Sequence, residues 1–571
     1  MQLNGPNRDC PRTSPYSSLH YAQPNNNDHR QHTQLGVHMS FSRRSFVKGA
    51  AGVAAIASLP ALKGCAADSA GAFRHGVASG DPLADRVIIW TRITPDSDGT
   101  STESADYSWR IALDPGMQAI ITEGSGTTTT ARDLTVKIDV TGLTPDTTYY
   151  YQFRHGSWLS DIGRTKTLPV GSVDHLRIAF TSCSWYTIGY FNVYKGIAER
   201  RDLDVVLHLG DYIYEYGQRL ANPLLPERQH KPNRDIVSLS DYRERHAQYK
   251  TDPHLQEAHR QHPFITVWDD HESANNAWQD GAENHDPSQQ GSWAERRARA
   301  IQAYFEWMPI RETGLDDRAD QLVYRNFRFG DLLNLSMLDT RLTGRDEQAQ
   351  LLDRETIKDP NRSLLGETQE AWLHQQLSDA QTQGVTWKLL GQQVMMAQLV
   401  ANEVILNEDQ WDGYPAARQR LFDHLKNDGI ENFGVLTGDI HTSWAANLQE
   451  NPFRNTDILG VEFVTPSVTS PASPEKVITH VVAEKLNLVL PHMHYVDLHY
   501  HGYVLLDIKH QSMQAEWHFA KSILIRDAPC FFSRAYRTDA GRPGLYRVFR
   551  ASSSKPSAPF APEMSIFDKM V

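Results

Sequence analysis

Long apolar runs mark the chain from about residue 175 onward, and polar side chains follow them directly. Runs of about five to eight apolar residues are typical of strands buried on both faces of a sheet. The strands predicted in this way lie in HLRIAFTSC, DVVLHLGDY, PFITVWDDHE, LLNLSMLDTR, VTWKLLGQQVMM, NFGVLTGDIHTSW and ILGVEFVTPSVTSP. Charged and apolar positions at helical spacing predict helices at 294–308 and 367–381. Strands that alternate with helices indicate an α/β layered domain.

A different pattern precedes this domain. Between residues 73 and 168, short runs such as RVIIWTRI and LTVKIDV alternate with turn-rich segments, as in a β-sandwich. Residues 142–149, GLTPDTTY, resemble the corner of a fibronectin type III domain, in which a Tyr hydroxyl bonds back to the chain. A final strand pair, GYVLLDIK and MQAEWHFAK, is expected to close the layered domain near residue 521. We therefore expect a β-sandwich at 73–168, a layered domain at 175–525 and a C-terminal tail at 526–571, with a segment that covers the domain as the open alternative for the last of these.

The N-terminal segment is predicted to direct export rather than to fold. Residues 1–38 are polar and rich in Asn, Gln and His, as disordered extensions are, and Met39 is an alternative start. A pair of arginines at 43–44 precedes an apolar run, which is the order of a twin-arginine signal peptide over 39–68. The run is too short for a transmembrane span. We expect a periplasmic, secreted or cell-surface protein that meets the twin-arginine export machinery, with lipidation of Cys65 as an open alternative.

Composition narrows the classes of function. The chain has 571 residues, enough for two or more domains, and a net charge of −12. No excess of positive charge offsets phosphate repulsion, so nucleic-acid binding is not predicted. Four cysteines are too few for a disulfide framework, and a bridge between Cys183 and Cys530 is left open. No P-loop, dinucleotide-binding glycine fingerprint or Gly-x-Ser-x-Gly motif stands out, which argues against kinases, dehydrogenases and serine hydrolases.

Side chains that bind metal ions follow several of the predicted strands. They are Asp211, Asp269, Asp270, Asp339, Asp439 and His441. In open α/β sheets, ligands bind at the carboxyl ends of the strands, so these residues should converge on one rim. Cys183 also follows a strand, and its thiolate would be a good ligand for iron or zinc, a buried apolar cysteine being the alternative. The sequence therefore predicts a metal site and a metal-dependent hydrolase.

Five motifs in order give a specific resemblance. They are TSCS at 181–184, GDYIYE at 210–215, WDDHE at 268–272 with the following Asn275-Asn276, LDTR at 338–341, and GDIH at 438–441. Over roughly residues 73–525, the chain resembles the PhoD-type alkaline phosphatases, a family that includes iron-dependent phospholipase D-like enzymes. The resemblance implies an α/β metallophosphoesterase-like domain after a fibronectin type III-like β-sandwich. It implies Fe(3+) at Cys183, Asp211, Tyr214 and His441, and Ca(2+) near Asp211, Asp270, Asn275 and Asp439.

Two further residues are candidates for catalysis. His271 follows Asp270, and the resemblance indicates a stabiliser of the transition state or a general acid, with a structural His–Asp pair as the alternative. Arg341 offers a planar fork that suits phosphate, and a structural ion pair with Asp339 is the alternative. Four histidines between residues 492 and 501 fit no clean metal-site spacing and are expected to be structural or to lie at the rim.

The function expected from this reasoning is that of an exported alkaline phosphatase or phosphodiesterase. It would hydrolyse phosphate esters by in-line attack of metal-activated hydroxide. The substrate would be a small-molecule phosphate ester or a phospholipid head group. The alternatives are a phospholipase D-like diesterase that acts on lipid head groups, and a surface binding protein without catalysis.

Overall fold

The computed structural model describes residues 71–94, 103–218, 222–313, 321–401, 404–454, 456–472 and 476–565. The predicted extension, the twin-arginine segment and Cys65 lie outside these residues. Within the described ranges, no helix has the length and apolar character needed to cross a membrane.

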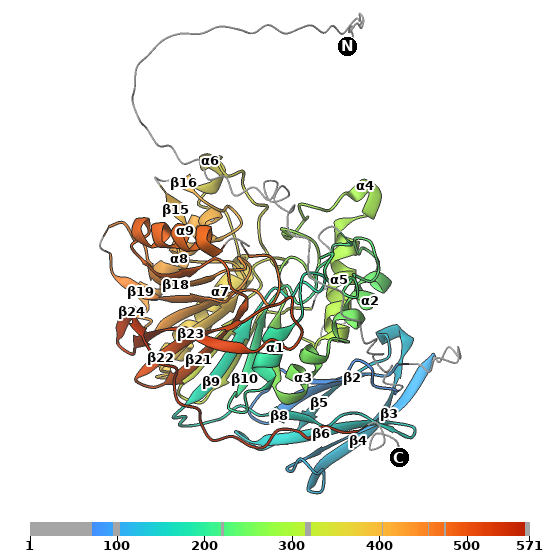
Figure 1. Ribbon diagram of the computed structural model, residues 1–571. Helices are drawn as coiled ribbons and strands as arrows, with labels where there is room; N and C mark the ends of the chain where they lie inside the picture. The colour runs from blue at the N-terminus through green and yellow to red at the C-terminus, as the bar shows by residue number, and fades with distance from the viewer. Residues whose placement is uncertain are drawn as a thin grey trace, which may run out of the picture. The chain divides into compact units, whose positions relative to one another are not determined.

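Two large sheets form the layered domain (Figure 1). The first has ten strands in the order β24-β23-β22-β21-β9-β10-β11-β1-β2-β5. These strands are β1 Val77–Gly80, β2 Arg86–Arg92, β5 Thr135–Thr141, β9 Leu176–Thr181, β10 Val205–Leu209, β11 Pro263–Val267, β21 Gly502–Lys509, β22 Ser512–Ala520, β23 Cys530–Asp539 and β24 Arg542–Val548. The second has seven strands in the order β12-β13-β14-β17-β19-β18-β20. They are β12 Arg325–Phe329, β13 Leu333–Met337, β14 Trp387–Gln392, β17 Phe433–Thr437, β18 Ser443–Gln449, β19 Ile458–Val464 and β20 Met493–Asp497.

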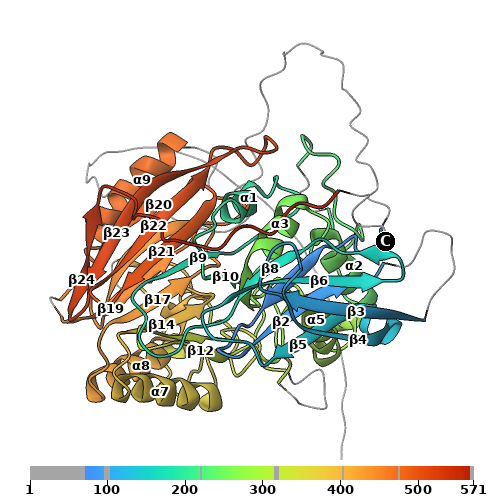
Figure 2. The ribbon, with the colours of Figure 1, turned by 90° about the horizontal axis from the view of Figure 1, so that it is seen from below.

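The two sheets share one core because their strands are apolar on both faces. Leu207 and Leu505 of the first sheet belong to the same buried cluster as Leu389, Leu436 and Phe463 of the second. Helix α7 contacts β13 and β14, and α8 contacts β19, so these helices cover the second sheet (Figure 2). The helices are α1 Asn192–Ala198, α2 Leu239–Tyr249, α3 Pro253–Gln261, α4 Pro287–Gln290, α5 Trp293–Trp307, α6 Arg354–Ile357, α7 Glu367–Thr382, α8 Pro415–Asn427 and α9 Lys476–Val489, with 3-10 turns at Thr130–Arg132 and Trp411–Gly413. The predicted α/β layered class is confirmed.

Part of the N-terminal β region belongs to the first sheet. Strand β1 pairs in parallel with β11, so β1, β2 and β5 continue the first sheet across the expected boundary near 168–175. A separate sheet faces this part, formed by β3 Ser104–Ala112, β4 Ile120–Thr129, β6 Thr148–His155, β7 Trp158–Leu159 and β8 Gly163–Lys166. A two-stranded hairpin elsewhere is formed by β15 Val400–Ala401 and β16 Val404–Ile405. At the predicted corner, the backbone N–H of Thr144 donates to the Tyr149 hydroxyl at 2.8 Å, as the resemblance to fibronectin type III implies.

The segment beyond residue 526 is more than a tail. Strands β23 and β24 form a hairpin that extends the first sheet from β22. Their side chains are mostly half-buried, so the apolar run that marks a central strand is missing there. After the hairpin, the chain returns toward the N-terminal region, where the Tyr150 hydroxyl donates to the Pro559 carbonyl at 2.7 Å. The backbone N–H of Ala561 donates to Gln261 in α3 at 3.0 Å.

Candidate metal centre

The carboxyl ends of seven parallel strands meet at the candidate site. Strands β9, β10 and β11 are parallel neighbours in the first sheet, and β13, β14, β17 and β19 are parallel neighbours in the second. Cys183, Asp211 and Asp439 each lie two residues past the end of their strand. Residues that are far apart in the sequence are therefore brought together by strand direction alone, as predicted.

Four of the site residues adopt an unusual backbone conformation. The φ angles of Cys183, Asp211, Asp439 and His441 are 61°, 56°, 57° and 60°. This left-handed region is uncommon for residues other than glycine, and such strain is concentrated at functional sites.

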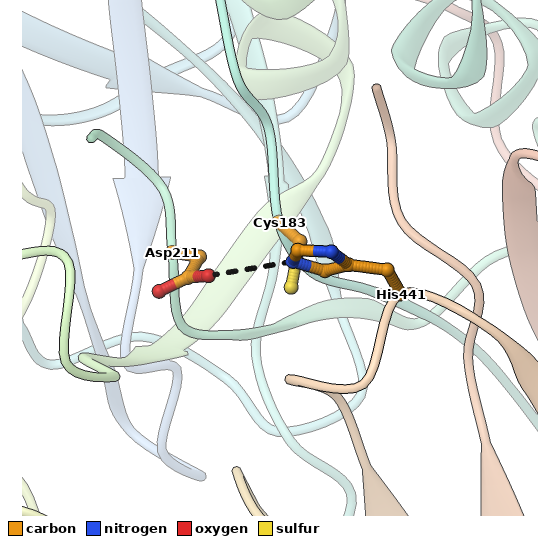
Figure 3. A group of neighbouring side chains, drawn as sticks. All are labelled: Cys183, Asp211 and His441. Atoms are coloured by element: carbon orange, nitrogen blue, oxygen red, sulfur yellow. Dashed lines mark ion pairs between the residues drawn. The ribbon is translucent and has the colours of Figure 1, made fainter. Parts of the chain in front are cut away.

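The residues expected to bind iron lie together. The ligand atoms of Cys183, Asp211 and His441 all lie within 4.8 Å of one another, and their side chains approach from three separate loops (Figure 3). The Tyr214 hydroxyl lies 2.7 Å from Asp211 Oδ2 and 3.3 Å from His441 Nε2. Burial, followed by the charge of Asp211, raises the pKa of the Cys183 thiol well above its usual value. A thiolate at this buried, carboxylate-rich position requires a cation beside it, so the donor set fits a metal ion.

Two further clusters of possible ligands, made mostly of carboxylate side chains, adjoin the cluster of Cys183, Asp211 and His441. The ligand atoms of Asp211, Asp270 and His271 lie within 4.8 Å of one another, and so do those of Asp269, Asp270 and Asp439. Asp211 therefore belongs to both the sulfur-containing cluster and an oxygen-rich one, as a bridging ligand would. Asp269 Oδ2 is buried and has no hydrogen-bond partner among the described residues. Oxygen donors of this kind fit a hard cation such as calcium.

Asn275 is held beside these carboxylates by its neighbours. Its amide oxygen accepts a hydrogen bond from the Tyr216 hydroxyl at 2.9 Å, and its amide nitrogen donates to Glu283 at 2.8 Å. Its backbone N–H donates to Glu215 at 2.9 Å. Ligation of calcium by Asn275 remains a prediction, in which the amide oxygen would contact the ion while Tyr216 orients it.

The imidazole of His271 is oriented by a carboxylate that the sequence reasoning missed. Its Nδ1 lies 2.6 Å from Glu215 Oε2, whereas its Nε2 lies 4.0 Å from Asp270 Oδ2. Burial alone would lower the pKa of His271, but the charges of Asp270, Glu215 and Asp211 outweigh it and hold that pKa well above the ordinary value. The short bond therefore joins His271 to Glu215 rather than to an aspartate. Glu215 ends the GDYIYE motif, so the signal for it was present in the sequence.

Arg341 is fully buried, and its guanidinium faces carboxylates on every side of its fork. Nε lies 2.5 Å from Asp269, one terminal nitrogen lies 2.8 and 2.9 Å from the two oxygens of Asp409, and the other lies 2.8 Å from Asp439. Of the two alternatives for Arg341, the structural ion pair is present but its partners are other aspartates, because Asp339 Oδ1 accepts the backbone N–H of Arg341 at 2.9 Å instead. Phosphate binding by this fork would have to displace a carboxylate, so the geometry favours a role in positioning.

Glu272 fastens two ligand-bearing loops to each other. Its Oε2 accepts the backbone N–H groups of Asp211 at 3.0 Å and Asp269 at 2.8 Å, and its Oε1 accepts that of Tyr212 at 2.5 Å. The loop after β10 and the loop after β11 are thereby held in register. Asp409, which lies between β16 and α8, performs a similar task through Arg341 and Arg345.

The possible disulfide and three of the four histidines between residues 492 and 501 can be placed in the structure. Cys183 and Cys530 are both free, so the possible bridge between them is absent. Nε2 of His492 lies 2.9 Å from the Gln398 carbonyl, Nε2 of His494 lies 2.9 Å from the Asn447 amide, and Nδ1 of His501 lies 2.9 Å from the Ser467 hydroxyl. Among the described residues, the clusters of side chains that could hold a metal ion do not include these histidines.

Comparison with known proteins gives two family matches. A family model described as PhoD-like phosphatase matches residues 178–517, and one described as PhoD-like phosphatase, N-terminal domain, matches residues 60–169. Alkaline phosphatase D of Bacillus subtilis (strain 168) is 39% identical over 455 residues, which cover 76% of this chain and 76% of that protein. A solved structure of PhoD has a TM-score of 0.78 at 35% identity and covers 85% of this chain and 93% of that one.

Proposed function

The chain belongs to the PhoD-like phosphatase family and is a phosphoric ester hydrolase, and we propose that it is an exported enzyme that uses Fe(3+) and Ca(2+). The observation that carries the proposal is the pair of adjoining ligand clusters at the strand ends. One contains sulfur, phenol and imidazole, and the other contains carboxylate oxygens.

The residues proposed for each metal follow the chemistry of their donors. Cys183, Tyr214 and His441, with Asp211, would hold Fe(3+), because thiolate and phenolate oxygen donate strongly to iron. Asp270, Asp439 and Asn275, with Asp211, would hold Ca(2+), because calcium prefers oxygen ligands. The bound ions would supply Lewis acidity, which polarises phosphoryl oxygens and makes hydroxide available near neutral pH.

The protein's own groups would then orient and protonate the substrate. His271 is the proposed catalytic residue, because Glu215 fixes its Nδ1–H and leaves Nε2 directed toward Asp270 and the carboxylate cluster. Nε2 would stabilise the charge that develops on the phosphoryl group or give a proton to the leaving oxygen. Arg341 would keep Asp269, Asp409 and Asp439 in place while they carry negative charge.

The proposed location is the periplasm, the cell surface or the medium. The arginine pair at 43–44 and the apolar run after it would direct the folded protein through the twin-arginine export machinery. The proposed substrate is a small-molecule phosphate ester, and a phospholipid head group is the alternative. Retention of all the ligand-type side chains in one place weighs against a binding protein without catalysis.

The test is phosphate release from an aryl phosphate by the purified protein, beside product release from an aryl phosphodiester, with and without a calcium chelator. Calcium-dependent release is expected, and the ratio of the two rates separates monoester from diester preference. Metal analysis of the same sample is expected to give iron. A protein that contains neither metal, or that turns over equally well after both are removed, would overturn the metal assignment.

A further inference from the structure

The segment Ser467–Pro471, which follows β19, contacts several proposed iron ligands although it carries no ligand itself. Its sequence, SVTSP, contains no known metal-binding or catalytic motif. Ser467 to Ser470 are fully buried. We call this segment the brace. It forms an isolated parallel bridge with Ser182, so it runs beside the Cys183 turn.

The brace holds the strained turn at Cys183 through backbone bonds. The carbonyl of Ser182 accepts the N–H of Val468 at 2.9 Å. The carbonyl of Cys183 accepts the N–H groups of Thr469 at 3.3 Å and Ser470 at 3.2 Å. These bonds satisfy buried carbonyl groups that the left-handed turn removes from the β9 ladder.

The side chain of Ser470 reaches the phenol of Tyr214. Its hydroxyl lies 2.6 Å from the Tyr214 oxygen and 2.9 Å from the Cys183 carbonyl. A hydroxyl has one proton to donate, and the Cys183 carbonyl already accepts two backbone N–H groups. The Ser470 hydroxyl is therefore expected to donate its hydrogen bond to the Tyr214 oxygen. This bond is stronger when the Tyr214 oxygen is a phenolate than when it carries a proton.

The end of the brace orients the fourth ligand. Nδ1 of His441 lies 3.2 Å from the carbonyl of Pro471. A carbonyl oxygen only accepts, so Nδ1 carries the proton and Nε2 keeps its lone pair. Nε2 is the atom that faces Tyr214 and Asp211. Outer partners of this kind fix the ring orientation of histidine ligands.

We propose that Ser470 is a positioning residue of the metal centre, whose hydroxyl donates to the Tyr214 oxygen and holds the phenolate in the direction required for iron. The inference rests on the proposed function, because it concerns the same iron ligands. A hydrogen bond to a phenolate lowers the energy of its donor electrons, so it raises the energy of the phenolate-to-iron absorption band. The direction in which the bond holds the phenolate separately decides how well the oxygen can meet the ion.

The experiment compares Ser470→Ala with a matched control, Thr465→Val, in the iron-loaded protein. Thr465 is fully buried in the same connection, but its hydroxyl lies 3.3 Å from the Phe180 carbonyl and touches no ligand. The readouts are the energy of the phenolate-to-iron absorption band, resonance Raman bands of tyrosinate, and the rate of iron loss to a chelator. Ser470→Thr restores the hydroxyl and tests for rescue.

Ser470→Ala is expected to move the band to lower energy and to release iron about 10-fold faster or more, as loss of an outer partner typically does. Thr465→Val is expected to change neither, and Ser470→Thr to return both toward the wild type. An unchanged band and release rate in Ser470→Ala would overturn the inference. Tyr214→Phe distinguishes a failure of the Ser470 inference from a failure of the iron assignment. If Tyr214→Phe keeps the tyrosinate Raman bands, the assignment of Tyr214 as an iron ligand fails, whatever the result for Ser470.

Discussion

Replacement of Glu272 by Gln tests whether one buried carboxylate holds the two ligand loops in register. Glu272 accepts three backbone N–H groups, from Asp211, Tyr212 and Asp269. The amide oxygen of Gln can replace the oxygen that accepts two of them, but its NH2 group then faces the N–H of Tyr212. One buried donor loses its acceptor, which costs about 1–3 kcal/mol. Burial and the charge of Asp211 raise the pKa of Glu272 to about 8, so the comparison is made at pH ~9, where the carboxylate is charged and the two remaining bonds also lose the strength that charge gives. We expect a total loss of about 3 kcal/mol in the free energy of unfolding.

Glu462 provides the matched control, because it also accepts two backbone N–H groups, from Met396 and Ala397, and one hydroxyl, from Thr437. The assay is urea unfolding of the metal-free protein, followed by metal retention and turnover of the loaded protein. Glu272→Gln is expected to lose stability, and also about 10-fold or more in metal affinity because the loops shift. Glu462→Gln is expected to lose stability only. If Glu272→Gln keeps wild-type stability and metal affinity, or if both variants lose metal equally, the register argument is refuted.

Three further predictions follow from buried charges and rings. Arg341→Met leaves Asp269 and Asp439 without their cation and Asp409 with Arg345 alone, so urea unfolding of the metal-free protein should show a loss of about 3–5 kcal/mol. An unchanged midpoint would contradict the ion-pair account. Glu215→Gln should lower kcat on the order of 10²-fold with little change in KM, because His271 loses its charged partner, and steady-state kinetics with normal kcat would contradict this. Burial lowers the pKa of His246 to about 3, so below pH ~6.5 the unfolded chain binds more protons than the folded protein and stability falls as the pH falls. This residue alone contributes about 2 kcal/mol to the difference in the free energy of unfolding between pH ~6.5 and pH ~5. His246→Phe should remove this contribution, as urea unfolding at the two pH values would show.

The buried parallel strands, and the residues at their carboxyl ends, are the part of the fold that can be predicted most directly from the sequence. Apolar runs buried on both faces are distinct, and their ends place Cys183, Asp211, Asp270 and Asp439 on one rim without any further information. The half-buried hairpin of β23 and β24 was missed for the opposite reason, since an edge strand needs no apolar run. The pairing of β1 with β11 was also missed, because the choice of a neighbour across about 180 residues depends on tertiary packing rather than on local pattern.

The residues that support the ligands could not be predicted in the same way. Asp409 meets Arg341 from a loop 68 residues away, and Ser470 meets Tyr214 across 256 residues. Neither has a periodic position or a motif, because its task is to satisfy a particular group whose location exists only after folding. Glu215 and Glu272 lie inside recognised motifs, yet their bonds to His271 and to backbone N–H groups depend on how the loops meet.

The composition of the centre implies that metal binding and stability are coupled. Asp211, Asp269 and Asp270 are buried and Asp439 is half-buried, all within one small region. Asp211 and Asp439, together with Cys183 and His441, also have left-handed backbones. Arg341 offsets part of this negative charge, but Asp269 Oδ2 still has no partner among the described residues. Burial raises the pKa of Asp439 to about 6, although Arg341 opposes the shift, so without a cation the charged form of this carboxylate is less favourable than it is in water. Ions that bind the folded centre and not the unfolded chain would relieve this repulsion, and each would add stability in proportion to the logarithm of its concentration relative to its Kd. The arrangement that prepares the site for metal ions is therefore the same arrangement that makes the metal-free fold costly.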